Sequence, residues 1–282
     1  MAIKIITDST SYIPEEIARK LDISIVSLSV FFNGESHKEI DLDNREFYRH
    51  IEETGEIPKS SQPNIDELFN IFKKITDNGD EIVGIFISSK MSGTYSSAGL
   101  VKNMILENNK DAVIEIVDSC TNCMQMGFIA IEAARVAKSG SLIKDVVETA
   151  EQVRRNSRFL FVPDTLRYLQ RGGRIGTASA LIGGILQIKP ILTVENGETT
   201  VFEKVRTKKK AVDEILNKVL NDCQKNKIKG VIVHHIDCQK EGSQLAEKLS
   251  QKLNIPVNIQ SIGPVIGAHV GPGAIGVAYF TE

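Results

Sequence analysis

The chain has 282 residues, of which 41% are hydrophobic and 25% are charged, and its net charge is −2. This length is enough for one large or two ordinary domains, and the near-neutral charge argues against the basic surface of a nucleic-acid-binding protein. The N-terminus turns polar after Ile6, and no window approaches the ~18 uninterrupted apolar residues of a membrane-spanning helix. We therefore expect a soluble, cytoplasmic protein.

The first half of the sequence alternates short apolar segments with segments of helical periodicity. Strands are predicted at Ile3–Thr7, Ile25–Phe32, Glu81–Ile87 and Val113–Val117. Helices are predicted at Pro14–Leu21, Arg45–Thr54, Asn64–Asp77, Thr94–Asn108 and Cys123–Ser139. This alternation predicts an α/β domain whose parallel sheet carries helices on both faces.

The second half mixes hairpins with helices. A hairpin is predicted from Ile188–Glu195 and Thr199–Val205, because Asn196-Gly197 is typical of a tight turn. The other predicted elements are strands at Arg158–Val162, Gly230–His235, Val257–Ile262 and Ala274–Phe280, and helices at Lys208–Lys225 and Gly242–Lys252. We expect a parallel-sheet α/β domain at residues 1–157 and an α+β domain with a largely antiparallel sheet at residues 158–282.

The segment Leu166–Ile175, which reads L-R-Y-L-Q-R-G-G-R-I, precedes an apolar run at Ala178–Leu192. Arg171 and Arg174 form a basic rim beside this run. Such a rim, with Ile175 and Leu186 in the apolar part, suits a ligand with an acidic head and a long hydrocarbon body.

Small hydroxyl residues follow three of the predicted parallel strands, where ligands gather in such sheets. The sharpest case is Ser88–Thr94, in which Ser92 offers a hydroxyl and Gly93 allows a ligand to approach the backbone. This loop fits a carboxylate or a phosphate, although ordinary helix capping is an equal alternative. For Asp8, after the first strand, we favour a cap over a general base.

Ser60 lies in a second hydroxyl loop, Lys59–Pro63, which matters for function only if it faces Ser92. His269 lies in a glycine-rich segment, Gly263–Gly273, that we expect to form a loop. The flanking glycines would bring the imidazole close to a bound group, so His269 is a candidate binding residue. The pair His234-His235 is better explained as structural.

Three other patterns carry less weight. Cys120 and Cys123 form a C-x-x-C pair, which could be a redox pair, but we favour small reduced cysteines and predict no metal site. Gly271–Gly276 matches a dinucleotide-binding fingerprint, yet only six residues follow it, too few for the required helix. The sequence contains no P-loop, H-E-x-x-H, G-x-S-x-G or protein-kinase motif set.

Taken in order, several motifs give the chain a specific resemblance. They are T-D-S-T-S at Thr7–Ser11, S-S-Q-P at Ser60–Pro63, S-S-K-M-S-G-T-Y at Ser88–Tyr95, L-x-x-L-x-x-G-G-R-I at Leu166–Ile175, I-K-P-I-L at Ile188–Leu192, K-V-R-T-K-K-K-A at Lys204–Ala211 and G-A-H-V-G-P-G at Gly267–Gly273. With them the chain resembles the DegV family, which includes the fatty-acid-binding FakB subunits of bacterial fatty acid kinase. The motifs cover nearly the whole length.

The resemblance implies a lipid-binding protein with a long-chain fatty acid, such as palmitate, between two domains and no other cofactor. The carboxylate would be held by Ser60, Ser92, Gly93 and His269, where Ser60 replaces the family's threonine. Arg171 and Arg174 would then brace the domain junction or face a partner, and Ala178–Leu192 would line the tail.

The resemblance further implies that the protein is not itself an enzyme. It would present the fatty acid to a separate ATP-dependent kinase subunit for acyl-phosphate formation, with transient membrane contact compatible with this role. Two alternatives stay open: an acyl hydrolase or transferase using Ser92 and His269, and a sugar or phosphate binder, which would require a more polar pocket.

Overall fold

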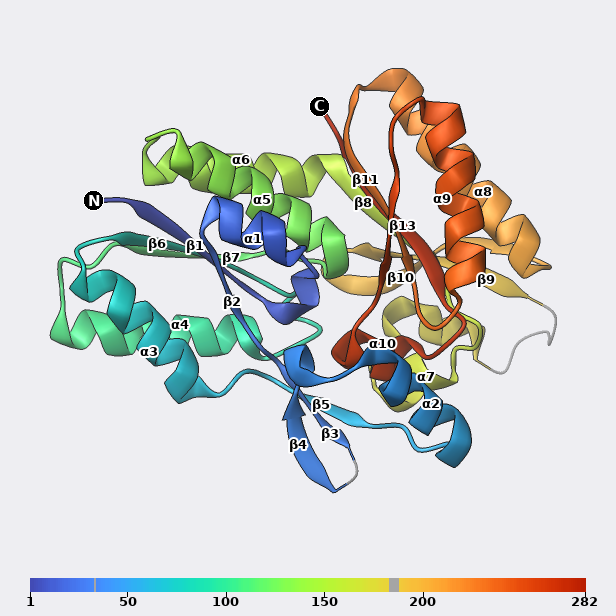
Figure 1. Ribbon diagram of the computed structural model, residues 1–282, viewed down its shortest axis with the longest axis horizontal. Helices are drawn as coiled ribbons and strands as arrows, with labels where there is room; N and C mark the ends of the chain where they lie inside the picture. Colours follow the sequence, from blue (N-terminus) through green and yellow to red (C-terminus); the bar gives the residue numbers. More distant parts are fainter. Residues whose placement is uncertain (33, 183–187) are drawn as a thin grey trace. The chain divides into compact units, whose positions relative to one another are not determined.

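The computed structural model describes residues 1–32, 34–182 and 188–282, which form two compact units. The first unit comprises residues 1–29 and 61–155, and the second comprises residues 30–60 and 156–282. Each unit contains a β-sheet covered by helices (Figure 1).

The first unit is built on a fully parallel sheet. Its strands follow the order β2 (Ile23–Val26), β1 (Ile3–Asp8), β6 (Glu81–Phe86) and β7 (Ile114–Asp118). In the register of this sheet, Ile5 lies opposite Ile23 on one side and Val83 on the other. The side chains of β6 are almost continuously buried, as expected for a parallel sheet covered on both faces.

Helices cover both faces of this sheet, which confirms the sequence prediction (Figure 1). On one face lie α3 (Ile65–Asp77) and α4 (Thr94–Asn108), and on the other lie α1 (Glu15–Leu21) and α5 (Cys123–Lys138). A further helix, α6 (Ile143–Asn156), was not predicted. Asn64 caps α3, because its side chain accepts hydrogen bonds from the Asp66 and Glu67 amides.

The second unit contains a six-stranded, mostly antiparallel sheet. Its order is β10 (Glu198–Val205), β9 (Lys189–Glu195), β8 (Ser157–Val162), β13 (Ile275–Thr281), β11 (Ile228–His235) and β12 (Asn258–Ser261). Among the described strands of this sheet, β11 and β12 pair in parallel and the other neighbours pair antiparallel. Helices α8 (Lys208–Lys225) and α9 (Gln239–Leu253) bury Ile215 and Leu245 against Val233 and Val277 of this sheet. The predicted largely antiparallel sheet is therefore confirmed.

The hairpin between β9 and β10 has the predicted turn. Glu195 pairs with Glu198, and between them Asn196 and Gly197 have φ angles of 51° and 83°. Positive φ at both central residues is the requirement of a type I′ turn, which asparagine and glycine meet at low cost.

Residues 30–60 pack with the C-terminal half, which differs from the expected single domain at residues 1–157. Helix α2 (Asn44–Thr54) shows the reason: the Tyr48 hydroxyl donates to the carbonyls of Ile262 and Gly263 at 2.7 and 3.0 Å. The predicted strand at Ile25–Phe32 is accordingly divided into β2 and β3 (Ser29–Phe32). β3 joins a separate sheet with β4 (Glu35–Lys38) and β5 (Lys59–Ser61).

The segment expected to be a glycine-rich loop contains a helix, α10 (Pro264–Val270). Pro264 starts it because its fixed φ suits the first helical position, and Gly271, with φ 84°, follows its end. At Gly267 there is no room for a side chain, because a Cβ there would lie 2.0 Å from the Tyr48 hydroxyl. The expectation of a loop was wrong: the glycines allow close packing of a short helix.

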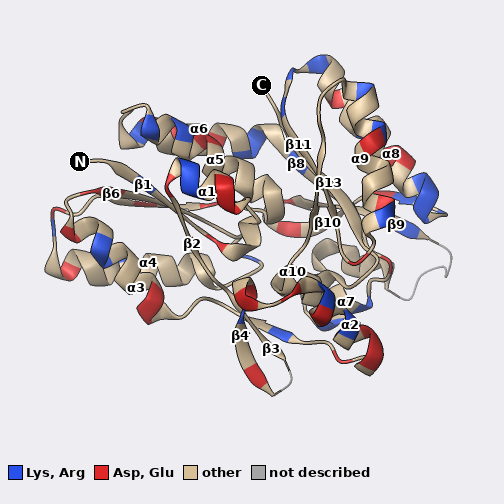
Figure 2. Cartoon of the chain, viewed as in Figure 1, with Lys and Arg blue, Asp and Glu red and all other residues tan. Residues whose placement is uncertain are grey.

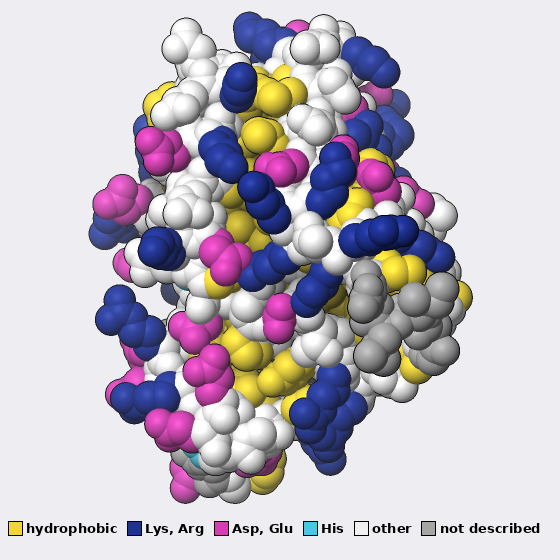
Figure 3. Space-filling view, turned by 90° about the vertical axis from the view of Figure 1, so that its right-hand side faces the viewer, with side chains coloured by type: hydrophobic (Ala, Val, Ile, Leu, Met, Phe, Trp, Pro, Cys, Tyr) yellow, Lys and Arg dark blue, Asp and Glu magenta, His cyan; other side chains and the backbone are white. Residues whose placement is uncertain are grey.

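Charged residues are distributed unevenly among the helices. Helix α10 has no Lys, Arg, Asp or Glu, whereas α8 and α9 have residues of both signs (Figure 2). Lys and Arg side chains, with hydrophobic ones between them, are prominent on the face to which α8 and α9 contribute (Figure 3). In the described part of the chain, no helix combines the length and the apolar character needed to cross a membrane.

Candidate functional site

In the first unit, hydrogen bonds tie together the carboxyl ends of the parallel strands. The Asp8 carboxylate, after β1, accepts from the Thr10 amide at 3.0 Å and from the Ile87 amide at 2.8 Å. The Ser119 amide, after β7, donates to the Phe86 carbonyl at 3.1 Å. Asp8 thus caps the short 3-10 helix Ser9–Ser11, as predicted, and also fixes the start of the loop that carries Ser92.

Asp8 is completely buried. Burial raises the pKa of its carboxyl to about 6, against the opposing effect of its hydrogen bonds from Ile87 and Thr10. The side chain therefore titrates close to neutral pH, although its contacts are those of a structural residue.

The loop between β6 and α4 presents Ser92 and Gly93. The Ser92 hydroxyl lies 2.8 Å from the Thr94 hydroxyl and accepts from the Thr94 amide at 3.3 Å. Gly93 is exposed, and a Cβ at this position would lie 2.1 Å from Oε1 of Gln62. In this structure the glycine therefore gives room to the Gln62 amide group, a neighbour that the sequence analysis did not identify.

In the second unit, Ser60 and His269 form a direct pair. The Ser60 Oγ lies 2.7 Å from His269 Nε2, although the two residues are 209 positions apart. Ser60 comes from β5 and His269 from the last turn of α10. The fold thus brings together two predicted site residues that the sequence could not place relative to each other.

The imidazole of His269 is neutral near physiological pH. Burial, and secondarily the positive charge of Arg174, lowers its pKa to about 4. Its Nδ1 is buried without a hydrogen-bond partner among the described residues. A neutral ring and a hydroxyl can bind an anionic oxygen without a buried charge pair.

The segment with the two arginines lies beside this pair. Helix α7 (Arg167–Arg171) packs against α10, and a Cβ at Gly172 would lie 2.2 Å from His269 Nδ1. The Arg174 Nη1 donates to the Gly172 carbonyl at 2.7 Å. The side chains of Arg171 and Arg174 are exposed. The G-G-R motif therefore contacts the histidine, which the sequence analysis did not anticipate.

The predicted apolar lining is described only in part. Ile175 and Ala178 are buried, and the strand that begins at Lys189 continues into the sheet. Leu186 falls within residues 183–187, outside the described residues, so its predicted role stays a prediction.

The cysteine pair does not have the features of a redox site. Burial raises the pKa of the Cys120 thiol, whereas a reactive thiol needs a lowered pKa. Cys123 is fully buried, and neither residue forms a disulfide. Of the two neighbouring histidines, His234 is buried within the sheet, where burial lowers its pKa to about 3. Both findings agree with the structural interpretations.

Together, the parallel sheet, the mostly antiparallel sheet and the Ser60–His269 pair define an α/β protein with a neutral hydroxyl–imidazole site. Residues 2–282 match the family described as "Uncharacterised protein, DegV family". The chain belongs to the DegV family. It is 53% identical, over 100% of its own length and 99% of the relative's, to a DegV domain-containing protein of Clostridium acetobutylicum. It is 36% identical to the DegV protein of Bacillus subtilis, over 99% of both chains.

Solved structures show the same fold. A DegV family protein of Thermus thermophilus, described by its fatty acid binding, superimposes with a TM-score of 0.92 at 27% identity, over 100% of both chains. DegV of Bacillus subtilis, described as a fatty acid binding protein, superimposes with a TM-score of 0.90 at 35% identity, again over 100% of both chains. A stearic acid-binding protein of Eubacterium ventriosum superimposes with a TM-score of 0.89 at 26% identity, over 99% of this chain and 98% of that one.

Proposed function

We propose that this protein binds a long-chain fatty acid and that Ser60, Ser92, Gly93 and His269 bind its carboxylate. The observation that carries the proposal is the contact of Ser60 with a neutral His269, 2.7 Å apart, in a chain that matches fatty-acid-binding relatives over its full length. Ser92 and Gly93 are assigned to the same ligand because they lie in a sequence motif shared with the DegV family.

The chemistry of these groups suits a carboxylate with an apolar tail. Hydroxyl and imidazole groups donate hydrogen bonds to carboxylate oxygens without the tight ion pair that an arginine would form. Each buried methylene contributes about 0.8 kcal/mol, so a tail of roughly sixteen carbons would supply most of the affinity before ordering costs. The Ala178–Leu192 segment is our candidate for part of the lining.

We further propose that the bound acid is presented to an ATP-dependent fatty acid kinase subunit. A carboxylate held by neutral donors keeps an oxygen available to attack the γ-phosphorus of ATP, which forms an acyl phosphate as ADP leaves. Transient contact with a membrane would allow loading. Incubation of the palmitate-loaded protein with ATP and such a subunit should give a product that hydroxylamine traps as a hydroxamate. If a kinase subunit that is active on a known carrier gives no hydroxamate with this protein, the presentation proposal is contradicted.

Native mass spectrometry combined with lipid extraction tests the binding. The purified protein should carry, or take up, palmitate or oleate, and Ser60→Ala and Ser92→Ala should weaken retention while the fold is kept. Ser96→Ala is the matched control, because Ser96 is exposed on the same helix that follows Ser92. Absence of any fatty acid, or equal retention in the Ser60→Ala/Ser92→Ala double variant, would refute the assigned site.

The alternative, an acyl hydrolase or transferase using Ser92 and His269, lacks one expected part. A catalytic histidine needs an acidic group at its second nitrogen, and His269 Nδ1 has no partner in the described part of the chain. Its pKa of about 4 also makes it a weak general base. Turnover of an acyl ester that disappears in Ser92→Ala would favour this alternative over binding.

A further inference from the structure

The proposed function gives no role to three side chains that bind the start of α10, the helix that carries His269. Glu39 is buried, and its Oε1 accepts from the Val265 amide in the first turn of α10 at 2.9 Å. The Nδ2 of Asn44, at the start of α2, donates to the Ile262 carbonyl just before α10 at 3.2 Å. The third side chain comes from α2, which packs against α10. We define the α10 clamp as these three residues: Glu39, Asn44 and Tyr48.

Tyr48 fixes α10 by shape as well as by hydrogen bonds. Its side chain is 1% exposed, and its hydroxyl donates to the carbonyls of Ile262 and Gly263 at 2.7 and 3.0 Å. A Cβ at Gly267 would lie 2.0 Å from the hydroxyl oxygen and 2.7 Å from Cζ of the ring. The phenol therefore occupies the space that a side chain at this position of α10 would need.

The chain segment that supplies the clamp also supplies Ser60. Residues 30–60 belong to the second unit, and at their end the Ser60 Oγ lies 2.7 Å from His269 Nε2. The clamp contacts residues 262–267, whereas Ser60 contacts the last turn of α10. One continuous segment therefore contacts this short helix at both ends.

A helix as short as α10 depends on such contacts for its orientation. It has seven residues, and isolated helices of this length are not stable in water. At 1.5 Å per residue it is only about 10 Å long, so a tilt at its first turn also moves His269 in its last turn. Hydrogen bonds weaken steeply when their distance and angle depart from the preferred values.

We propose that Glu39, Asn44 and Tyr48 are positioning residues, which hold α10 so that His269 stays in place to act on the carboxylate of the ligand. This inference rests on the proposed function for the identity of the ligand. The hold on α10 is a property of the unliganded protein and can be measured without lipid.

The experiment uses the full chain and two pairs of variants. Tyr48→Phe removes the hydroxyl and keeps the ring, and Tyr279→Phe is its matched control, because Tyr279 is a buried tyrosine of the same unit whose hydroxyl donates to Asp222 of α8. Glu39→Leu removes the acceptor of the Val265 amide, and Glu39→Gln keeps an acceptor oxygen at that place.

Two measurements separate positioning from a purely structural role. The first is the ratio of the affinities for palmitate and for hexadecanol, an alcohol with a tail of the same length, because this ratio reports on the head group alone. The second is hydrogen–deuterium exchange of the amides of residues 264–271 relative to those of α8, in the protein without lipid.

We expect Tyr48→Phe and Glu39→Leu to lower the affinity ratio about fivefold to tenfold, equivalent to the loss of about one hydrogen bond. Exchange at residues 264–271 should become faster in both variants. Glu39→Gln should restore the ratio, and Tyr279→Phe should leave it unchanged although it also destabilises the fold. Tyr48→Phe/His269→Gln should have the same ratio as His269→Gln alone, because the clamp acts through His269.

The proposal is overturned if the ratio falls no further in Tyr48→Phe and Glu39→Leu than in Tyr279→Phe. A wild type with no affinity for palmitate would instead refute the proposed function. In that case the exchange data still decide the clamp, and unchanged exchange at residues 264–271 in both variants would show that Tyr48 and Glu39 do not hold α10.

Discussion

Ser60 and His269 show how environment changes the chemistry of ordinary side chains. The serine hydroxyl carries no charge. His269 is also neutral at neutral pH, because burial and Arg174 lower its pKa to about 4. A site of this kind is suited to an anion, because directed hydrogen bonds are strong when the acceptor is charged. Such a site avoids the desolvation cost of a buried cation.

Asp8 gives a pH-dependent prediction at the same scale. Burial raises its folded-state pKa to about 6, above the ordinary value of 3.8, so the folded protein binds more protons than the unfolded chain between these pH values. The free energy of unfolding should therefore fall as pH rises from about 4 to about 6, by up to about 3 kcal/mol at ~1.4 kcal/mol per pKa unit.

Urea unfolding of wild type and Asp8→Asn across this pH range measures the effect. The difference in free energy between the two proteins should change with pH through this window. Asp111→Asn, at an exposed position, should show no such change relative to wild type. A pH-independent difference for Asp8→Asn would contradict the raised pKa.

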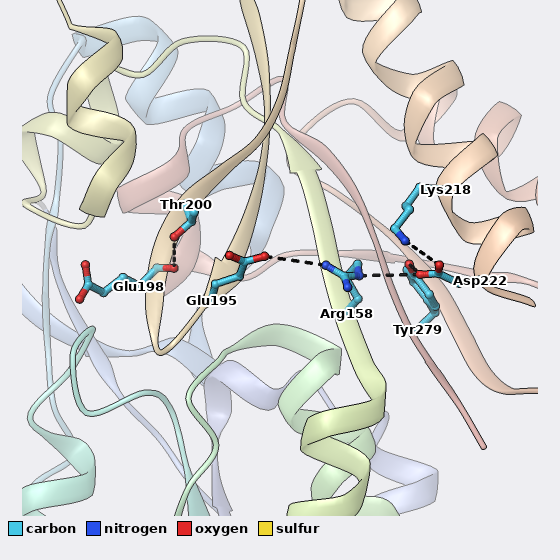
Figure 4. A network of polar contacts seen from close by, with 7 residues as sticks. All are labelled: Arg158, Glu195, Glu198, Thr200, Lys218, Asp222 and Tyr279. Atoms are coloured by element: carbon cyan, nitrogen blue, oxygen red, sulfur yellow. Dashed lines mark hydrogen bonds and ion pairs between the residues drawn. The ribbon is translucent and has the colours of Figure 1, made fainter. Parts of the chain in front are cut away.

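Among the elements, α8 is joined to the antiparallel sheet by a polar network (Figure 4). Asp222 of α8 accepts from the Tyr279 hydroxyl of β13 at 2.7 Å and from Lys218 at 2.6 Å, and lies 3.8 Å from Arg158 of β8. Burial alone would raise the pKa of Asp222, but the hydrogen bonds from Lys218 and Tyr279 hold it below its ordinary value. The carboxylate is therefore charged at neutral pH and anchors the helix.

Tyr279→Phe should lower the free energy of unfolding by about 1–2 kcal/mol at neutral pH, because a buried donor to a charged acceptor is lost. This stabilisation should diminish as pH falls toward and below the ordinary pKa of Asp222, since protonation removes the charged acceptor. Chemical denaturation at pH 7 and pH 3.5 measures both effects.

Thr200→Val is the control for this network, because among the described residues the Thr200 hydroxyl makes only a 3.4 Å contact, with the Glu198 carbonyl of its own strand. It should change stability little. A double-mutant cycle of Tyr279→Phe with Asp222→Ala should be non-additive by more than about 0.5 kcal/mol. Additive effects would show that the contact does not contribute to stability.

For the whole molecule, the proposed ligand should stabilise the folded state. At a free concentration of about 100 times its Kd, palmitate would add about 2.7 kcal/mol to the free energy of unfolding, because it binds only the folded protein. Hexadecanol, which has the same tail and no carboxylate, should stabilise less. Thermal unfolding with each ligand tests the carboxylate's contribution.

Ser60→Ala sharpens this comparison. If Ser60 donates to the carboxylate, the variant should lose part of the preference for palmitate over hexadecanol and keep the effect of the tail. An unchanged preference in Ser60→Ala would show that the head group is bound elsewhere.

The sequence by itself determined the features that depend on neighbouring residues. The alternation of strands and helices predicted a parallel sheet followed by a mostly antiparallel one, and Asn196-Gly197 predicted the hairpin turn. These signals are local, because side-chain periodicity and backbone preferences act over a few residues. The ordered motifs also identified the family, and they predicted Ser60, Ser92 and His269 as site residues.

Tertiary structure decided what depends on distant contacts. Residues 30–60 pack with the second unit, where Tyr48 binds carbonyls more than 200 positions away. Within Gly263–Gly273, residues Pro264–Val270 form a helix in which Gly267 leaves room for the same tyrosine. The Ser60–His269 pair and the approach of Gly172 to that ring arise in the same way. No periodicity encodes such contacts, since they form only when the elements pack and bury their shared apolar surface.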